Sequence, residues 1–220
     1  MAATTPRSSD QIRRFSAGER WAHLALAALM LVLITTAAVL YVDPLSTLVG
    51  RRALLSTVHL WAGLLLPLPL ILAVVLSPAF RADASRLNRF VPADWVWLRR
   101  ALRGDVSGPS GKFNAGQKLN SAFVVAAALI MFITGLMMHF FALVPDDLRT
   151  GATFVHDVFA LFVMMVSTGH IWMAWSDPRA RQGLRTGYVS RDWARTKHPL
   201  WDVEVDDSTT APAPDVRGSS

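Results

Sequence analysis

The chain contains four long, predominantly apolar stretches that lack Asp, Glu, Lys and Arg: residues 22–42, 53–80, 119–144 and 158–176. Each stretch has at least 19 residues, and a helix of about 20 apolar residues crosses the hydrocarbon core of a bilayer. Apolar side chains surround each projected helix, whereas a helix in a soluble bundle keeps a polar face. The pattern therefore predicts an all-α integral membrane protein, a bundle of four transmembrane helices.

The polar segments outside these stretches predict three further features. In residues 91–103 a proline precedes alternating Trp, Leu and Arg residues, which predicts an amphipathic helix on the cytoplasmic surface between the second and third spans. We expect residues 1–12 to be a disordered cytoplasmic N-terminus and residues 13–201 to form the domain that contains the four spans. Residues 202–220, rich in Thr, Ala, Pro and Asp, predict a flexible cytoplasmic tail.

Composition and charge agree with this topology and set its orientation. Hydrophobic residues make up 52% of the chain and charged residues only 17%, below the roughly 25% of a typical globular protein. Of the 22 Lys and Arg residues, 19 lie before the first span, between the second and third, or after the fourth; the other three are Arg51, Arg52 and Arg149. Because cytoplasmic loops retain Lys and Arg, both termini are expected to be cytoplasmic. The net charge of +6 does not predict nucleic-acid binding, since the basic residues flank the spans.

The sequence contains no cysteine. This excludes disulfides, a thiolate-held iron–sulfur cluster, a covalently attached c-type haem and a cysteine nucleophile within this chain. Any metal that the chain binds must therefore be held by His, Met or oxygen ligands.

Histidines lie near both ends of the predicted spans. His23 and His170 fall near the cytoplasmic ends, and His59 and His156 near the outer ends. Ionisable side chains within a membrane are costly and mark functional sites. Fourteen residues separate His156 from His170, which gives about 21 Å of helical rise and roughly the same face of the helix. Two imidazole pairs at two depths predict two haems, each held between two axial histidines.

Other interpretations of the histidines remain open. A single intramembrane histidine is often a hydrogen-bonded packing residue, and a row of histidines could also conduct protons or metal ions. Such a transporter would need acidic or polar residues between the two layers, where the spans offer little beyond Thr35, Thr36, Thr134, Ser167 and Thr168. We expect His139 to have a structural or interfacial role and His198, just before Pro199, to lie on the surface.

A second group of polar residues, 113–118 (FNAGQK), stands where the third span begins. Asn114 and Gln117 supply neutral donors and acceptors, and Gly116 permits close approach to the backbone. Beside an electron carrier, these groups suit the carbonyl of a quinone. The spacing equally fits a helix start, with Asn114 as N-cap and Gln117 at the capping-box position. The two interpretations are compatible, because a helix start also presents free N–H groups.

Five motifs occur together in one known family: residues 14–23 (RFSAGERWAH), 59–63 (HLWAG), 113–118 (FNAGQK), the span from 156 to 170, and 187–201 (GYVSRDWARTKHPLW). Through them the chain resembles the gamma subunit, a membrane cytochrome b, of bacterial respiratory formate dehydrogenases. The resemblance covers about residues 14–201, and the NAGQK string and the tail motif are its specific parts. The histidine-bearing helices alone would also fit the cytochrome b of another respiratory complex, of the hydrogenase or thiosulfate reductase type.

The resemblance implies a division of labour in the bacterial inner membrane. In that family a molybdenum- or tungsten-pterin alpha subunit oxidises formate, and an iron–sulfur beta subunit passes the electrons to the gamma subunit. The gamma subunit carries two b haems and delivers the electrons to menaquinone or ubiquinone. This chain would therefore be enzymatic only as part of the complex, in contact with these two subunits and with membrane lipid.

The resemblance also implies roles for individual residues. It matches the outer-haem ligands to His59 and His156, the cytoplasmic-haem ligands to His23 and His170, and the quinone site to Asn114, Gly116 and Gln117 with His170. The chain differs from the family in having Thr196, Lys197 and His198 where a His-His pair is common, and in the acidic Asp157 directly after a predicted ligand.

Overall fold

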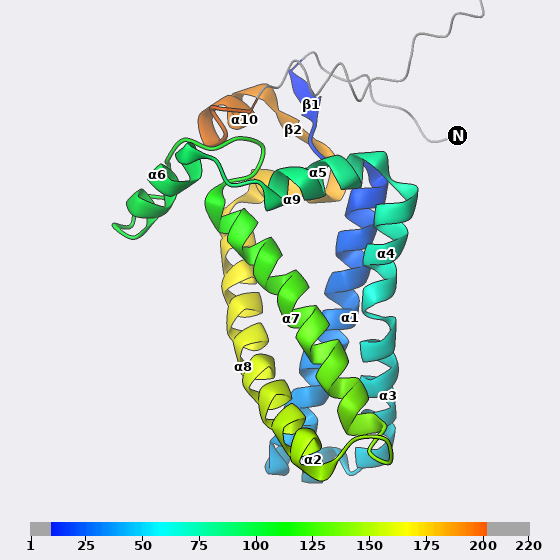
Figure 1. Cartoon of the computed structure of the whole chain (residues 1–220). Coiled ribbons are helices and arrows are strands. Elements are labelled where there is room, and N and C mark those ends of the chain that lie inside the picture. Colours follow the sequence, from blue (N-terminus) through cyan, green and yellow to red (C-terminus); the bar gives the residue numbers. More distant parts are fainter. Residues whose placement is uncertain (1–9, 202–220) are drawn as a thin grey trace, which may run out of the picture.

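The computed structural model describes residues 10–201, which form ten helices and two short strands (Figure 1). Four spans dominate the architecture: α1 (Ala17–Tyr41), α3 (Arg52–Leu65) together with α4 (Pro67–Leu76), α7 (Ala115–His139), and α8 (Asp146–Ser176). The helices α1 and α3 pack as one hairpin and α7 and α8 as a second. The predicted all-α bundle of four membrane-spanning helices is confirmed.

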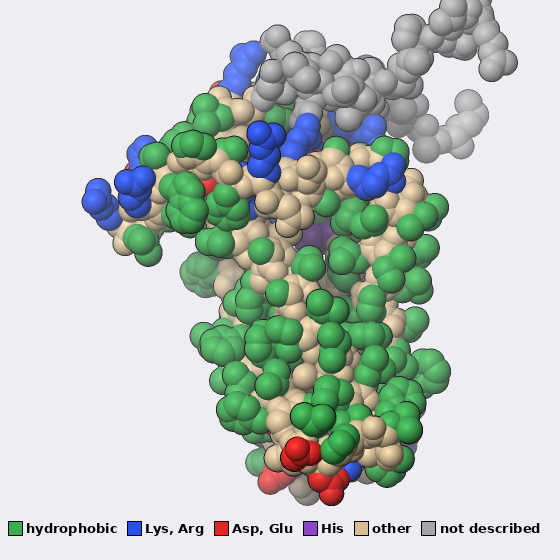
Figure 2. All heavy atoms as spheres, viewed as in Figure 1, with side chains coloured by type: hydrophobic (Ala, Val, Ile, Leu, Met, Phe, Trp, Pro, Cys, Tyr) green, Lys and Arg blue, Asp and Glu red, His purple; other side chains and the backbone are tan. Residues whose placement is uncertain are grey.

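The outside of the bundle is an apolar belt. Large side chains such as Leu31, Leu129 and Leu161 are exposed on different spans, and Figure 2 shows apolar side chains along the length of the visible face. In water such a surface would be strongly unfavourable, whereas lipid hydrocarbon solvates it. The chain is therefore a multi-pass membrane protein.

A proline breaks the second span between α3 and α4. Pro67 has no N–H group, so it cannot make a helical hydrogen bond, and its ring crowds the preceding turn. The preceding Leu66 N–H bonds to the carbonyl of Gly63 at 3.3 Å, three residues back instead of four. The span consequently consists of two helical segments, of which α3 carries His59.

The two ends of the bundle have different coverings. At the end where α1 stops and α8 starts, the short helix α2 (Asp43–Val49) joins the first two spans and ends at Gly50, whose φ of 62° suits glycine. At the other end, called the basic end below, lie the remaining elements: α5 (Pro78–Asn88), α6 (Pro92–Ala101), α9 (Pro178–Thr186), α10 (Arg191–Lys197), β1 (Gln11–Arg13) and β2 (Tyr188–Ser190). Figure 1 shows α6 projecting sideways from the basic end.

Segments far apart in the sequence close the basic end. The strands β1 and β2 pair antiparallel, with Ile12 opposite Val189. Both side chains are almost fully buried, together with Trp193, Ala194 and Trp201. This small apolar core ties the segment before the first span to the segment after the fourth.

The structure adjusts one expectation outside the spans and agrees with another. The segment 1–12 was expected to be disordered, but Gln11 and Ile12 belong to β1, so the ordered part begins before residue 13. The cause is long-range pairing with β2. The rest of that segment, 1–9, and the expected flexible tail, 202–220, lie outside the described residues. The helix expected within 91–103 is present as α6.

Candidate functional site

The first histidine pair lies near the end where α8 begins. His59 projects from α3 and His156 from α8, and their ring centres are 6.4 Å apart with the ring planes at 66°. A side chain added at Gly135 of α7 would place its Cβ 3.5 Å from Cε1 of His156. The two helix hairpins therefore bring together the two residues that the sequence predicted as one pair.

Each of these histidines is held by a threonine on the neighbouring helix. Thr36 Oγ1 lies 2.8 Å from Nδ1 of His59, and Thr134 Oγ1 lies 2.9 Å from Nδ1 of His156. Both hydroxyls donate their single proton to a carbonyl four residues back, at 2.7 Å in each case. Their oxygens therefore accept from the imidazoles, so each Nδ1 carries a proton.

This hydrogen bonding determines which nitrogen is available to a metal. Because Nδ1 is protonated and bonded to threonine, Nε2 of His59 and of His156 has a free lone pair. A second partner that fixes the tautomer and the ring plane is typical of metal-binding histidines. The sequence showed Thr36 and Thr134 as polar residues in apolar spans, but not as partners of the two histidines.

The second pair lies near the basic end. His23 on α1 and His170 on α8 have ring centres 6.2 Å apart and ring planes at 42°. Both side chains are exposed in the structure, and a Cβ at Gly169 would meet no other heavy atom within 4 Å. Figure 2 shows a histidine at the bottom of a recess close to this end of the bundle. The space beside this pair is thus open.

A single helix contributes to both pairs. The helix α8 runs from Asp146 to Ser176 and carries His156 and His170. Their separation of 14 residues corresponds to about 21 Å of helical rise. The structure thus places two imidazole pairs one above the other across the bundle, as the sequence predicted.

The spacing within each pair fits a haem. An imidazole nitrogen binds a metal at about 2.0 Å and its ring centre lies roughly 1.1 Å farther away, so two imidazoles on one iron have centres about 6.2 Å apart. The measured separations are 6.2 Å for His23 with His170 and 6.4 Å for His59 with His156. With two neutral nitrogen ligands in each pair, the donor set also suits an electron-carrying haem.

The polar group at the start of α7 forms a capping box. Asn114 Oδ1 accepts from the Gln117 backbone N–H at 2.9 Å, and Gln117 Oε1 accepts from the Asn114 backbone N–H at 3.0 Å. This is the helix-start interpretation of the sequence. It uses the two side-chain oxygens, and the two amide nitrogens lie outside the box, where they can donate to a ligand.

Gly116 has a packing role in this structure. A Cβ at this position would lie 3.0 Å from Cη2 of Trp97, and the Trp97 side chain is buried against α7. The tight contact explains the glycine without a ligand. A buried ion pair between Lys118 Nζ and Asp94 Oδ2, at 2.6 Å, fixes α6 to α7 beside this contact.

His198 is buried, so the expectation that it lies on the surface is wrong. Its exposed fraction is 4%. Nδ1 donates to the Gly111 carbonyl at 2.7 Å, and Nε2 lies 3.5 Å from Nη2 of Arg14. Burial and the neighbouring guanidinium lower the pKa of His198 to about 4, and burial lowers the pKa of Arg14 to about 10. The neutral imidazole thus joins the two terminal segments at the basic end.

His139 belongs to neither pair. It ends α7, is exposed, and packs its ring edge-on against Phe140 with centres 4.9 Å apart. Its structural or interfacial role, expected from the sequence, stays a prediction.

Comparisons with known proteins identify a family and relatives. A family model described as "Prokaryotic cytochrome b561" matches residues 14–185. The cytochrome b556(Fdn) subunit of the nitrate-inducible formate dehydrogenase from Escherichia coli (strain K12) is 26% identical over 99 residues, covering 44% of this chain and 46% of the relative. The cytochrome b556 subunit of formate dehydrogenase from Haemophilus influenzae is 30% identical over 98 residues, covering 42% and 40%. The match thus spans less than half the length of each curated relative.

Proposed function

Because the chain belongs to the prokaryotic cytochrome b561 family, and hence to haem b proteins of the membrane, we propose that it carries electrons across the membrane through two b haems to a quinone. It does so as the membrane-anchoring subunit of a formate dehydrogenase complex. The two histidine pairs, with ring centres 6.2 and 6.4 Å apart, are the observation that carries the proposal.

The chain's own residues give each haem a different setting. His59 and His156 would hold the first haem, and two threonines already fix their ring planes. His23 and His170 would hold the second haem near the basic end, beside the open space at Gly169. When bound, each haem would accept and pass on one electron at a time.

The charge distribution supplies the direction. Nineteen of the 22 Lys and Arg residues lie before the first span, between the second and third, or after the fourth, and because cytoplasmic segments retain Lys and Arg, this supports a cytoplasmic basic end and cytoplasmic termini in the bacterial inner membrane. Electrons then enter at the His59–His156 pair on the outer side and leave at the His23–His170 pair. Quinone reduction at the basic end takes its protons from the cytoplasm.

The quinone is held where α7 begins. The side-chain nitrogens of Asn114 and Gln117 and the unpaired N–H groups of the first helical turn, including that of Gly116, donate to its carbonyl. The capping box fixes both side chains in position, and Trp97 over Gly116 forms an apolar wall.

The relatives favour formate as the electron source. The two curated proteins described above are cytochrome b556 subunits of formate dehydrogenases, so we assign partner subunits of that kind: an iron–sulfur beta subunit and a molybdenum- or tungsten-pterin alpha subunit. Hydrogenase and thiosulfate reductase complexes are the nearest alternatives. Membership of a haem b family disfavours the proton or metal transporter considered from the sequence.

Haem content tests the proposal first. A pyridine haemochrome assay on the purified full-length chain is expected to give two b haems per chain. One haem would remove one of the two pairs from the proposal, and none would contradict it altogether.

The electron donor and acceptor are tested in membranes that contain the intact complex. Formate is expected to reduce both haems, and added menaquinone or ubiquinone to reoxidise them. Reduction by hydrogen but not by formate would assign the chain to a hydrogenase instead.

A further inference from the structure

The helix α6 is fixed at the level where the apolar part of α7 begins. Lys118, which binds Asp94 of α6 at 2.6 Å, is the last charged residue before the charge-free run that starts at Leu119. Trp97 of α6 packs over Gly116 in the first turn of α7. These two contacts place α6 at the border between the polar end of the molecule and its apolar belt.

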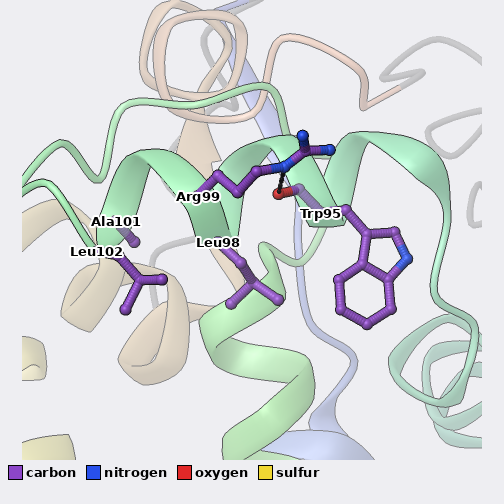
Figure 3. Close-up of a pocket in the computed structure, with 5 residues that line it drawn as sticks. All are labelled: Trp95, Leu98, Arg99, Ala101 and Leu102. Atoms are coloured by element: carbon purple, nitrogen blue, oxygen red, sulfur yellow. Dashed lines mark hydrogen bonds between the residues drawn. The ribbon is translucent and has the colours of Figure 1, made fainter.

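A second face of α6 is largely exposed, and its one aromatic contact within residues 10–201 comes from the segment before the helix, where the rings of Phe90 and Trp95 have centres 5.9 Å apart. Its residues Trp95 and Leu102 are 58% and 88% exposed. With Leu98, Arg99 and Ala101 they line an open hollow of about 700 Å³. Figure 3 shows Trp95, Leu98 and Leu102 pointing to the same side of α6, the side on which α7 continues into its span. The hollow therefore faces the level that lipid occupies.

One cation, Arg99, lines this hollow, and a second follows the lining residues in the sequence. Within residues 10–201 the Arg99 side chain makes one hydrogen bond, from Nε to the Trp95 carbonyl at 3.3 Å, so its terminal amino groups are available to an anion. Arg103 directly follows the last hollow residue. Arg100 is bound to Asp105 at 2.6 Å, and two hydrogen bonds from Ser107, together with this contact, lower the pKa of Asp105 to about 2. Asp105 thus neutralises Arg100, so Arg99 and Arg103 supply the net positive charge of residues 99–105.

An apolar groove at the interface with cations at its edge matches one class of ligand. We propose that the hollow beneath α6 binds an anionic phospholipid, with an acyl chain against Trp95, Leu98 and Leu102 and the phosphate against Arg99 and Arg103. Tryptophan and arginine are the residues that anchor helices at the headgroup level. Guanidinium groups also bind phosphate more specifically than a point charge does. This proposal does not rest on the haems or on formate.

The position of the hollow is tested with nitroxide labels, since the chain has no cysteine. The full-length chain with Leu102→Cys is labelled and placed in nanodiscs of phosphatidylcholine and phosphatidylglycerol. We expect the label to collide with oxygen, which concentrates in hydrocarbon, far more than with a water-soluble nickel chelate. Leu129→Cys on the apolar belt and Arg179→Cys on the polar end are the lipid and water controls. A label at 102 that behaves like the label at 179, or is shielded from both reagents, contradicts the proposal.

The lipid class is tested by native mass spectrometry from nanodiscs that contain both lipids. Each basic residue near an anionic surface contributes roughly a five-fold preference, so Arg99→Gln with Arg103→Gln is expected to lower retention of phosphatidylglycerol strongly, with phosphatidylcholine unchanged. Arg179→Gln removes a charge from the same end but outside the hollow and is expected to leave retention unchanged. An equal loss in Arg179→Gln would show only a general attraction between the basic end and anionic lipid, and would overturn the site.

The intact complex provides a further test. If the label at residue 102 collides with oxygen in the isolated chain but is shielded in the complex, a partner subunit covers the hollow, and the proposal is overturned.

Discussion

The hydroxyl of Thr134 on α7 lies 2.9 Å from Nδ1 of His156 on α8. The same contact recurs in the other helix hairpin, where Thr36 on α1 lies 2.8 Å from Nδ1 of His59 on α3. In each hairpin the threonine precedes its histidine by 22 or 23 residues. Both hydroxyls are bonded to their own helix as donors, so both imidazoles are held in the tautomer that leaves Nε2 free. The His59–His156 pair is therefore preorganised, with the lone pairs of both Nε2 atoms free.

Removing either hydroxyl is expected to loosen the outer haem. Thr134→Val leaves the Nδ1–H of His156 without its partner, which costs about 1–3 kcal/mol, and lost second partners of metal-binding histidines typically lower affinity about 10- to 100-fold. Haem retention under detergent, with electron paramagnetic resonance of the outer haem, measures the effect. Thr134→Ser keeps the hydroxyl and should retain the haem as the unchanged protein does. The hydroxyl of Thr168 bonds to the Met164 carbonyl in its own helix, α8, so Thr168→Val should leave haem retention unchanged. An equal loss of haem in Thr168→Val would mean that helix packing is responsible.

The four ligands are expected to separate into two independent pairs. His59→Ala or His156→Ala should remove the outer haem and block electron entry, while the inner haem is still assembled. His23→Ala or His170→Ala should remove the inner haem while the outer haem is still assembled. His139→Ala should retain both haems. Haem spectra of purified variants decide the matter. Loss of a haem in His139→Ala but not in His59→Ala would show that the outer pair is assigned wrongly.

The spans and the histidine pairs could be predicted because each follows from a local or topological rule. Hydrocarbon excludes charge, so the charge-free runs mark the helices, and alternating topology then fixes the depth of each histidine. The threonine partners were not predicted, because a threonine in an apolar span commonly bonds only to its own helix. Gly116 was interpreted as room for a ligand; that Trp97 also packs against it could not be predicted, because Trp97 comes from a separate helix.

Long-range contacts at the basic end explain the remaining errors. The two strands have three residues each, too short for an alternating pattern to appear in the sequence. His198 follows a lysine and precedes a proline, which favours an exposed turn. Its burial depends on Arg14, 184 residues away, and on the Gly111 carbonyl, 87 residues away. Such contacts become visible only once the fold brings the segments together.

The contacts of His198 predict that the basic end becomes less stable in acid. Its pKa is about 4 in the folded protein and 6.5 ordinarily, so between these values the unfolded form binds a proton that the folded form does not. Stability is therefore complete above pH 6.5 and falls by about 1.4 kcal/mol per pH unit towards pH 4. Amide exchange in β1, β2 and α10, corrected for the intrinsic pH effect, should rise over that range.

A matched variant isolates the contribution of His198. His198→Asn can keep a donor to the Gly111 carbonyl but has no group that titrates between pH 4 and 6.5, so its exchange should depend much less on pH. An equally steep dependence in His198→Asn would assign the acid sensitivity to another residue.

The capping box at α7 allows the two roles of Asn114 and Gln117 to be tested separately. Asn114→Asp and Gln117→Glu keep the oxygens that accept the two backbone N–H groups, and an acidic group at a helix start is favourable. Both changes remove the amide donors.

The two roles predict different outcomes. If these residues are only caps, the stability of the protein and the rate of quinone reduction should be unchanged. If their nitrogens donate to the quinone carbonyl, both haems should still be reduced by formate through the partner subunits. Their reoxidation by added quinone should then slow roughly 5- to 150-fold, for a lost hydrogen bond of about 1–3 kcal/mol. Stopped-flow haem spectra measure the two steps apart, and normal reoxidation in both variants would leave the box as a structural cap and the quinone site elsewhere.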